Sequence, residues 1–120
     1  MEVIQMKLWV DDVRPAPKGY VWCRSVRDAI ITIKLREARI ENILRRYTPS
    51  EMRMKDLSIQ IIDIDYDAGD YANDGGDYIK LLDWLEETGR NYPIRIHSMN
   101  PVGIENMRRI IQKNGWTEVK

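Results

Sequence analysis

Hydrophobic residues in this chain follow two patterns that alternate along the sequence. Short apolar runs rich in β-branched residues predict strands. These runs lie at Val3–Val10, Tyr20–Arg24, Leu57–Ile64, Pro93–His97 and Trp116–Val119. Segments in which apolar residues recur every three or four positions predict amphipathic helices. Such segments cover Ser25–Tyr47, Asp77–Glu87 and Pro101–Asn114. Strands that alternate with helices are typical of a parallel α/β sheet.

Right-handed connections between these strands predict a receiver-like or flavodoxin-like sheet with the strand order 2-1-3-4-5. One connection departs from that plan. The first two strands are separated by Arg14-Pro15-Ala16-Pro17-Lys18-Gly19, and two prolines with a glycine exclude a regular helix there. We therefore predict that a Pro-rich loop replaces the first crossover helix. The 120 residues are expected to form one compact domain, 1–120, because domains of about 100–150 residues are the commonest.

Capping residues mark where the predicted helices begin. Ser25 precedes the first helix and Asp28 follows three residues later, which is close to a capping box. Asn100 precedes Pro101, and a proline at the first helical position costs little because its missing N–H would have had no partner there. Asp74 is interpreted as the N-cap of the second helix rather than as a metal ligand.

Acidic and polar side chains follow three of the predicted strands. They are Asp11, Asp12, Asp65, Asp67, His97, Ser98 and Asn100. In open α/β sheets, ligands bind outside the carboxyl ends of the strands, at the point where the strand order reverses. That point lies between the first and third strands, so these three segments are expected to meet at one rim of the sheet.

Carboxylates that lie close together repel one another unless a proton or a cation sits among them. Oxygen ligands of this kind suit Mg²⁺, which commonly keeps several waters and bridges to a phosphate. The predicted cofactor is therefore Mg²⁺, with Asp11, Asp12, Asp65 and Asp67 as its expected ligands. A simpler interpretation stays open, because aspartates also cap turns and lie in solvated loops.

Groups suited to an anion are expected around the same rim. Arg14 could clamp an anion with its planar guanidinium, and Ser98 could donate to a phosphate oxygen. The backbone N–H groups of Val102 and Gly103 point out of the positive end of a helix, which is a ready anion site. His97, the single histidine, could transfer a proton near neutral pH. The alternative is a well-capped helix beside a structural histidine.

Composition narrows the classes of partner. The chain has 19 basic and 19 acidic residues, so it lacks the positive field of a protein with an extended nucleic-acid surface. Cys23 is the single cysteine, which excludes an internal disulfide and suits a reducing cytosol. No apolar run approaches the roughly 20 residues needed to span a bilayer. We expect a soluble cytoplasmic protein without a membrane partner, and the oligomeric state is left open.

Three motifs carry the chemistry of this rim. They read Leu8-Trp9-Val10-Asp11-Asp12-Val13-Arg14-Pro15, then Asp65-Tyr66-Asp67-Ala68-Gly69, then His97-Ser98-Met99-Asn100-Pro101-Val102-Gly103 with Glu105-Asn106-Met107. Together they resemble the cyclic-phosphate processing receiver-like domain family, a divergent relative of two-component receiver domains. The resemblance implies a domain that senses or processes cyclic-phosphate ends of nucleotides or RNA. The signature positions of the family fall on Asp11, Asp12, Arg14, Asp65, Asp67, His97, Ser98 and Asn100.

Tyr66 departs from the family's pattern, which has Asp-His-Asp after the third strand. Tyrosine can donate a hydrogen bond to a phosphate, but its ordinary pKa of about 10 makes it a poor general base at neutral pH. The predicted function is therefore binding of a small phosphorylated ligand or an RNA end. A metal-assisted phosphoesterase, with His97 and Asp65 as catalytic residues, stays open. Two alternatives are a regulatory receiver phosphorylated on Asp65 and an interaction module without ligand chemistry.

Overall fold

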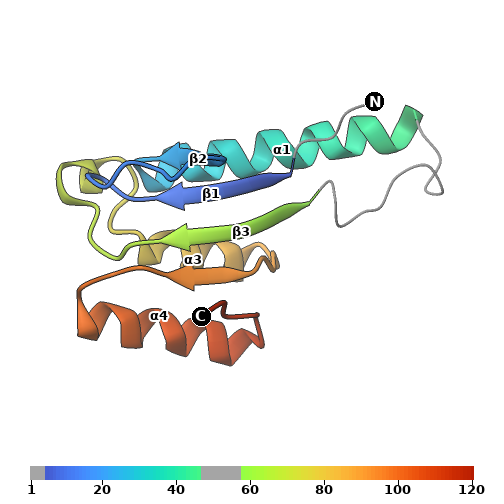
Figure 1. Ribbon diagram of the computed structural model, residues 1–120. Coiled ribbons are helices and arrows are strands. Elements are labelled where there is room, and N and C mark those ends of the chain that lie inside the picture. Colours follow the sequence, from blue (N-terminus) through green and yellow to red (C-terminus); the bar gives the residue numbers. More distant parts are fainter. Residues whose placement is uncertain (1–4, 47–57) are drawn as a thin grey trace.

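The computed structural model describes residues 5–46 and 58–120 (Figure 1). Its strands are β1 (Met6–Val10), β2 (Tyr20–Cys23), β3 (Ile59–Ile64) and β4 (Ile94–Ile96), and its helices are α1 (Val26–Arg46), α3 (Ile79–Glu87) and α4 (Pro101–Asn114). A 3₁₀ helix, η2 (Gly69–Asn73), follows β3. These elements confirm the predicted α/β class. The predicted ends at Val3, Tyr47 and Leu57 lie outside the described residues.

The four strands form one parallel sheet in the order β2-β1-β3-β4. The predicted order is thus confirmed for its first four strands, but the predicted fifth strand at 116–119 is wrong for the described chain. That segment makes a single bridge between Ile94 and Glu118, with hydrogen bonds from the Ile94 amide to Thr117 and from the Val119 amide to Ile94. Since β4 has only three residues, it offers too short an edge for a longer ladder.

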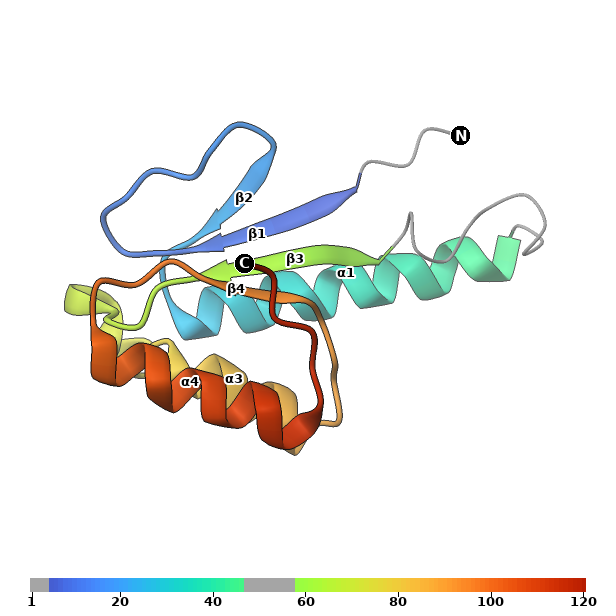
Figure 2. The same cartoon turned by 60° about the horizontal axis from the view of Figure 1, so that its bottom comes forward.

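The hydrophobic core lies between one face of the sheet and the three helices, which sit together on that side in Figure 2. Leu8, Val10, Ile62, Ile64 and Ile94 point from the strands into this core and are fully buried. Alternate side chains of a strand point to opposite faces. Cys23 also belongs to the core, and burial raises the pKa of its thiol to about 12.

The opposite face of the sheet carries a different set of side chains. By strand alternation and register, it presents Lys7, Trp9, Tyr20, Trp22, Asp63 and Arg95. No helix of the described chain covers this face (Figure 2). The reason lies in residues 11–19, which form the predicted Pro-rich loop instead of a first crossover helix. Side chains on this face therefore cover one another.

The N-caps predicted for α1 and α4 are confirmed, but the one predicted for α3 is not. The Ser25 hydroxyl accepts from the Asp28 amide at 3.0 Å, and the Asn100 carbonyl oxygen of the side chain accepts from the Gly103 amide at 3.0 Å. The predicted N-cap role of Asp74 is wrong, because α3 begins at Ile79 without a side-chain cap. Asp74 instead accepts from the Ser25 hydroxyl at 2.6 Å. No helix in the described ranges is long and apolar enough to cross a membrane.

Candidate functional site

His97 follows β4, and its ring lies between two buried carboxylates. Nδ1 lies 2.6 Å from Oδ1 of Asp63, and Nε2 lies 2.9 Å from Oδ2 of Asp11. The side chains of Asp63 and Asp11 are 1% and 0% exposed, and that of His97 is 9% exposed. An ionised carboxylate only accepts hydrogen bonds, so a ring nitrogen that carries a proton can donate to the carboxylate beside it. We call these three residues the histidine clamp.

Two further side chains enclose the clamp. Trp9 stacks on the His97 ring with a centroid separation of 3.8 Å and an angle of 5° between the planes. Arg95 donates from Nη1 to Oδ2 of Asp63 at 3.2 Å. Trp9 is therefore nearly buried, and it packs on the site rather than in the main core.

Both side-chain oxygens of Asp11 make polar contacts that hold the carboxylate in place. Oδ1 accepts from the amides of Val13 and Arg14 at 3.0 and 2.9 Å, while Oδ2 contacts the His97 ring. Burial alone would raise the pKa of Asp11, but these backbone N–H groups and His97 together hold it below its ordinary value of 3.8. Asp11 is thus an ionised carboxylate whose position is set by the turn after β1.

Asp11, Asp12 and Asp65 form a carboxylate cluster, because one oxygen of each lies within 4.8 Å of the others. Burial raises the pKa of Asp12 above its ordinary value, and the charges of Asp11 and Asp65 raise it further. A β-carbon on Gly69 would lie 2.3 Å from Oδ2 of Asp12. Gly69 also has a φ of +55°, so the backbone of η2 needs glycine to approach the cluster this closely.

The start of α4 uses most of its donors to cap itself. The Gly103 amide donates to the Asn100 side chain, and the Ile104 amide donates to the Asn100 backbone carbonyl at 2.9 Å. The Ser98 hydroxyl accepts from the Asn100 amide at 3.1 Å. The Gly103 amide, one of the two predicted to bind an anion, is therefore already paired. The Val102 amide is the better candidate donor.

Other predicted site residues lie around the cluster in different ways. Arg14 donates from Nη1 to the backbone carbonyl of His97 at 3.0 Å, so its guanidinium bridges the ends of β1 and β4. The Tyr66 ring packs against the start of α4, where a β-carbon on Gly103 would lie 2.4 Å from Tyr66 Cγ. Asp67 is exposed and lies outside the carboxylate cluster. Three of the four predicted metal ligands thus come together.

Asp63 is the site residue that the sequence pattern concealed. It lies within the Ile-rich strand β3, which the sequence predicted as a strand without assigning Asp63 to the site. The signal was its spacing of two from Asp65, which places both on the same face of the strand. A carboxylate buried between isoleucines needs a charged partner, and His97 with Arg95 supplies it.

Comparison with known proteins identifies the family of this chain. The model of the cyclic-phosphate processing receiver domain matches residues 6–113, from the first residue of β1 to the last residue but one of α4. Searches of curated proteins and of solved structures found no match.

Proposed function

This chain belongs to the cyclic-phosphate processing receiver domain family, and we propose that it binds cyclic or terminal phosphate groups of nucleotides or RNA ends through Mg²⁺. The observation that carries the proposal is the convergence of Asp11, Asp12 and Asp65 at the end of the sheet. Like charges held this close favour a cation among them. A hard divalent ion with free coordination sites would in turn hold a phosphate.

The carboxylate cluster fits Mg²⁺ in its donor chemistry. Asp12 would be the main ligand, because burial and, to a smaller extent, the charges of Asp11 and Asp65 raise its pKa, and a cation would relieve this unfavourable ionisation. Asp65 accepts from the Tyr66 amide through Oδ1 at 2.7 Å, which leaves its second oxygen for the metal. Asp11 offers a lone pair from a carboxylate that is already held in place. Bound Mg²⁺ would supply a positive charge for the phosphate and keep the remaining waters.

Arg14 and the start of α4 would contact the anion from the other side of the rim. Nη1 of Arg14 is used by the His97 carbonyl, so Nε and Nη2 are the atoms left for a phosphate oxygen. The Val102 amide at the positive end of α4 would add a second donor. Ser98 keeps its O–H for donation, since its oxygen is the acceptor in the bond to Asn100.

His97 is a positioning residue in this proposal. Both ring nitrogens contact buried carboxylates, so proton transfer to a ligand would first have to break one of these short bonds. The ring instead fixes the position of Asp11 through the contact of its Nε2 with Oδ2, and it thereby holds Asp11 beside Asp12. The proposal is therefore binding rather than turnover by a histidine base.

The proposal is tested by titrating the protein with a 2′,3′-cyclic nucleotide at fixed Mg²⁺ in a calorimeter. We expect saturable binding that EDTA abolishes and that Asp12→Asn and Asp65→Asn each weaken at least tenfold. Asp67→Asn is the matched control, since its carboxylate lies outside the cluster. Heat signals that are equal in all four proteins would contradict the proposal. Covalent labelling of Asp65 by acetyl phosphate, without nucleotide binding, would favour the phosphoacceptor alternative.

A further inference from the structure

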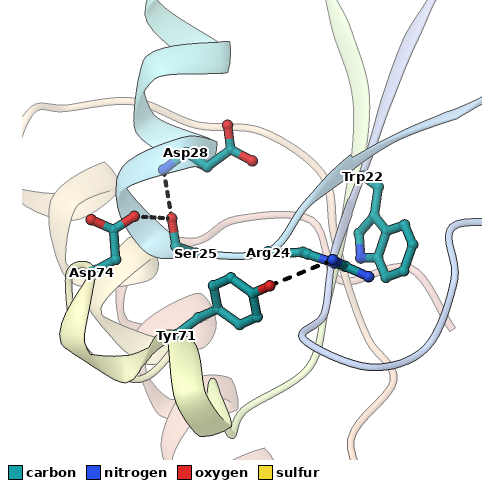
Figure 3. A pocket seen from close by; sticks show the side chains of 6 residues that line it. All are labelled: Trp22, Arg24, Ser25, Asp28, Tyr71 and Asp74. Atoms are coloured by element: carbon teal, nitrogen blue, oxygen red, sulfur yellow. Dashed lines mark hydrogen bonds between the residues drawn. The ribbon is translucent and has the colours of Figure 1, made fainter.

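A pocket with both aromatic and charged side chains opens between the end of β2, the start of α1 and η2. It has a volume of about 510 Å³ and is lined by Trp22, Arg24, Ser25, Asp28, Tyr71 and Asp74. Figure 3 shows the Arg24 side chain between the rings of Trp22 and Tyr71. None of these residues takes part in the phosphate site proposed above.

The two aromatic rings and the guanidinium form a layered wall. The Arg24 guanidinium carbon lies 4.0 Å from the centroid of the Trp22 ring and 5.9 Å from that of Tyr71. Nη1 of Arg24 also donates to the Tyr71 hydroxyl at 3.4 Å. Tyr78 holds the backbone of this segment, because its buried hydroxyl donates to the Arg24 carbonyl at 2.7 Å. Flat π surfaces of this kind stack on nucleobases.

The opposite wall of the pocket supplies hydrogen-bond acceptors. The Ser25 hydroxyl donates to Oδ2 of Asp74 at 2.6 Å and accepts from the Asp28 amide. The Asp28 carboxylate makes no hydrogen bond with any residue in the described ranges 5–46 and 58–120. A carboxylate accepts well from an exocyclic amino group such as N4 of cytosine, and it repels the carbonyl oxygen that uracil presents at the same position.

The pocket and the carboxylate cluster are joined by short stretches of chain. The Trp22 indole N–H donates to the backbone carbonyl of Asp11 at 2.8 Å, so one wall of the pocket touches the turn that carries the cluster. Tyr71, in the same wall as Trp22, lies two residues after Gly69, which packs directly on Asp12. A phosphate at the cluster and a ring in the pocket would therefore belong to neighbouring parts of one ligand.

We infer that this pocket is a nucleobase subsite. It takes an amino-bearing base, with cytosine as the type case, whose sugar carries the phosphate bound at the carboxylate cluster. The ring stacks on the wall formed by Trp22, Arg24 and Tyr71, and its amino group donates to Asp28. The inference rests on the proposed function and narrows its ligand to a nucleoside phosphate, either free or at the end of an RNA strand.

The test compares four probes by calorimetry in the presence of Mg²⁺: cytidine 2′,3′-cyclic phosphate, its uridine counterpart, cytidine without phosphate, and inorganic phosphate. We expect the cytidine cyclic phosphate to bind at least fivefold more tightly than the uridine compound. Asp28→Asn abolishes that preference, and Tyr71→Ala weakens both nucleotides about tenfold, as expected for loss of one aromatic stack. Asp83→Asn, on the exposed side of α3, is the matched control.

Tyr71→Phe keeps the ring without the hydroxyl and is expected to bind as tightly as the parent, which separates loss of stacking from loss of folding. Equal affinity for both cyclic nucleotides, together with binding unchanged by Tyr71→Ala, would overturn the subsite. If phosphate-bearing probes fail while cytidine binds in a manner that depends on Tyr71, the phosphate proposal falls and the subsite stands. If no probe binds, both fall.

A last arm replaces the mononucleotide with a trinucleotide that ends in a cytidine cyclic phosphate. Affinity that rises at least tenfold over the mononucleotide assigns the site to RNA ends. Equal affinity assigns it to free nucleotides. Both outcomes support the subsite, provided that the preference for cytidine and its loss in Asp28→Asn are retained.

Discussion

Replacing Asp63 with asparagine tests whether the histidine clamp organises the rim of the sheet. The change keeps the shape of the side chain and one acceptor oxygen but removes a buried negative charge. In the parent, Oδ1 of Asp63 lies 2.6 Å from Nδ1 of His97, and Oδ2 accepts a hydrogen bond from Arg95 at 3.2 Å. The variant leaves the His97 ring with one carboxylate instead of two, so the free energy of unfolding should fall.

The size of this fall follows from the burial of the groups. The carboxylate is 1% exposed and the imidazole 9%, whereas Arg95 is 49% exposed and well screened by water. Breaking a buried ion pair costs about 3–5 kcal/mol, and the remaining amide oxygen recovers part of that. We expect a loss of about 2–3 kcal/mol, which corresponds to roughly 8–12 °C in the melting temperature of a domain of this size.

Urea unfolding followed by tryptophan fluorescence measures this loss at neutral pH. Asp67→Asn makes the same chemical change at an exposed position outside the cluster, and it should alter stability by less than about 0.5 kcal/mol. A double-mutant cycle with His97→Ala isolates the pair, for which coupled neighbours give roughly 0.5–3 kcal/mol. If Asp63→Asn is as mild as Asp67→Asn, or if the cycle shows no coupling, the clamp does not contribute to the fold in the way argued here.

Three further predictions concern the rim. Gly103→Ala places a β-carbon 2.4 Å from the Tyr66 ring, and we expect a loss of about 1–3 kcal/mol in urea unfolding, which Tyr66→Ala in the same chain should partly restore. The pKa of Asp11 is lowered in the folded state, so the stability that this carboxylate contributes is complete above its ordinary pKa of 3.8 and is lost as the pH falls through the lowered pKa. In acid titrations, the stability of Asp11→Asn should therefore depend less on pH below about 4 than that of the parent. Because the raised pKa of Asp12 reflects unfavourable ionisation in the folded state, Asp12→Asn should melt at a higher temperature than the parent at neutral pH without divalent ions, and it should lose most of the stabilisation that Mg²⁺ gives the parent. A parent that melts at the same temperature with and without Mg²⁺ would contradict the last of these.

Much of the fold could be predicted from local patterns. The helix at Pro101–Asn114 has the predicted bounds, because its cap, its proline and the terminal Gly115 are all local signals. The sheet order followed from strand alternation and handedness. The fifth strand failed because its pairing depends on the length of the β4 edge, which is a tertiary property that no local pattern of residues 116–119 contains.

The candidate site was predictable only in its outline. Strand ends identified the segments that meet, but which side chains touch depends on register. Asp63 pairs with Arg95 in the parallel ladder between β3 and β4. Because Arg95 lies two residues before His97, this register brings Asp63 close to His97. Likewise, the side chain of Asn100 could be recognised as a cap, but the pairing of the Gly103 amide removes one of the donors that the sequence assigned to an anion.

The clamp also bears on the position where this chain departs from its family's pattern. Tyr66 occupies the place of the histidine expected between Asp65 and Asp67, and its ring fills the space against Gly103 at the start of α4. A tyrosine ring there supplies no imidazole for proton transfer, while the His97 ring is held by Asp11 and Asp63. These held side chains are the reason that we propose binding of a phosphate at this rim rather than its cleavage.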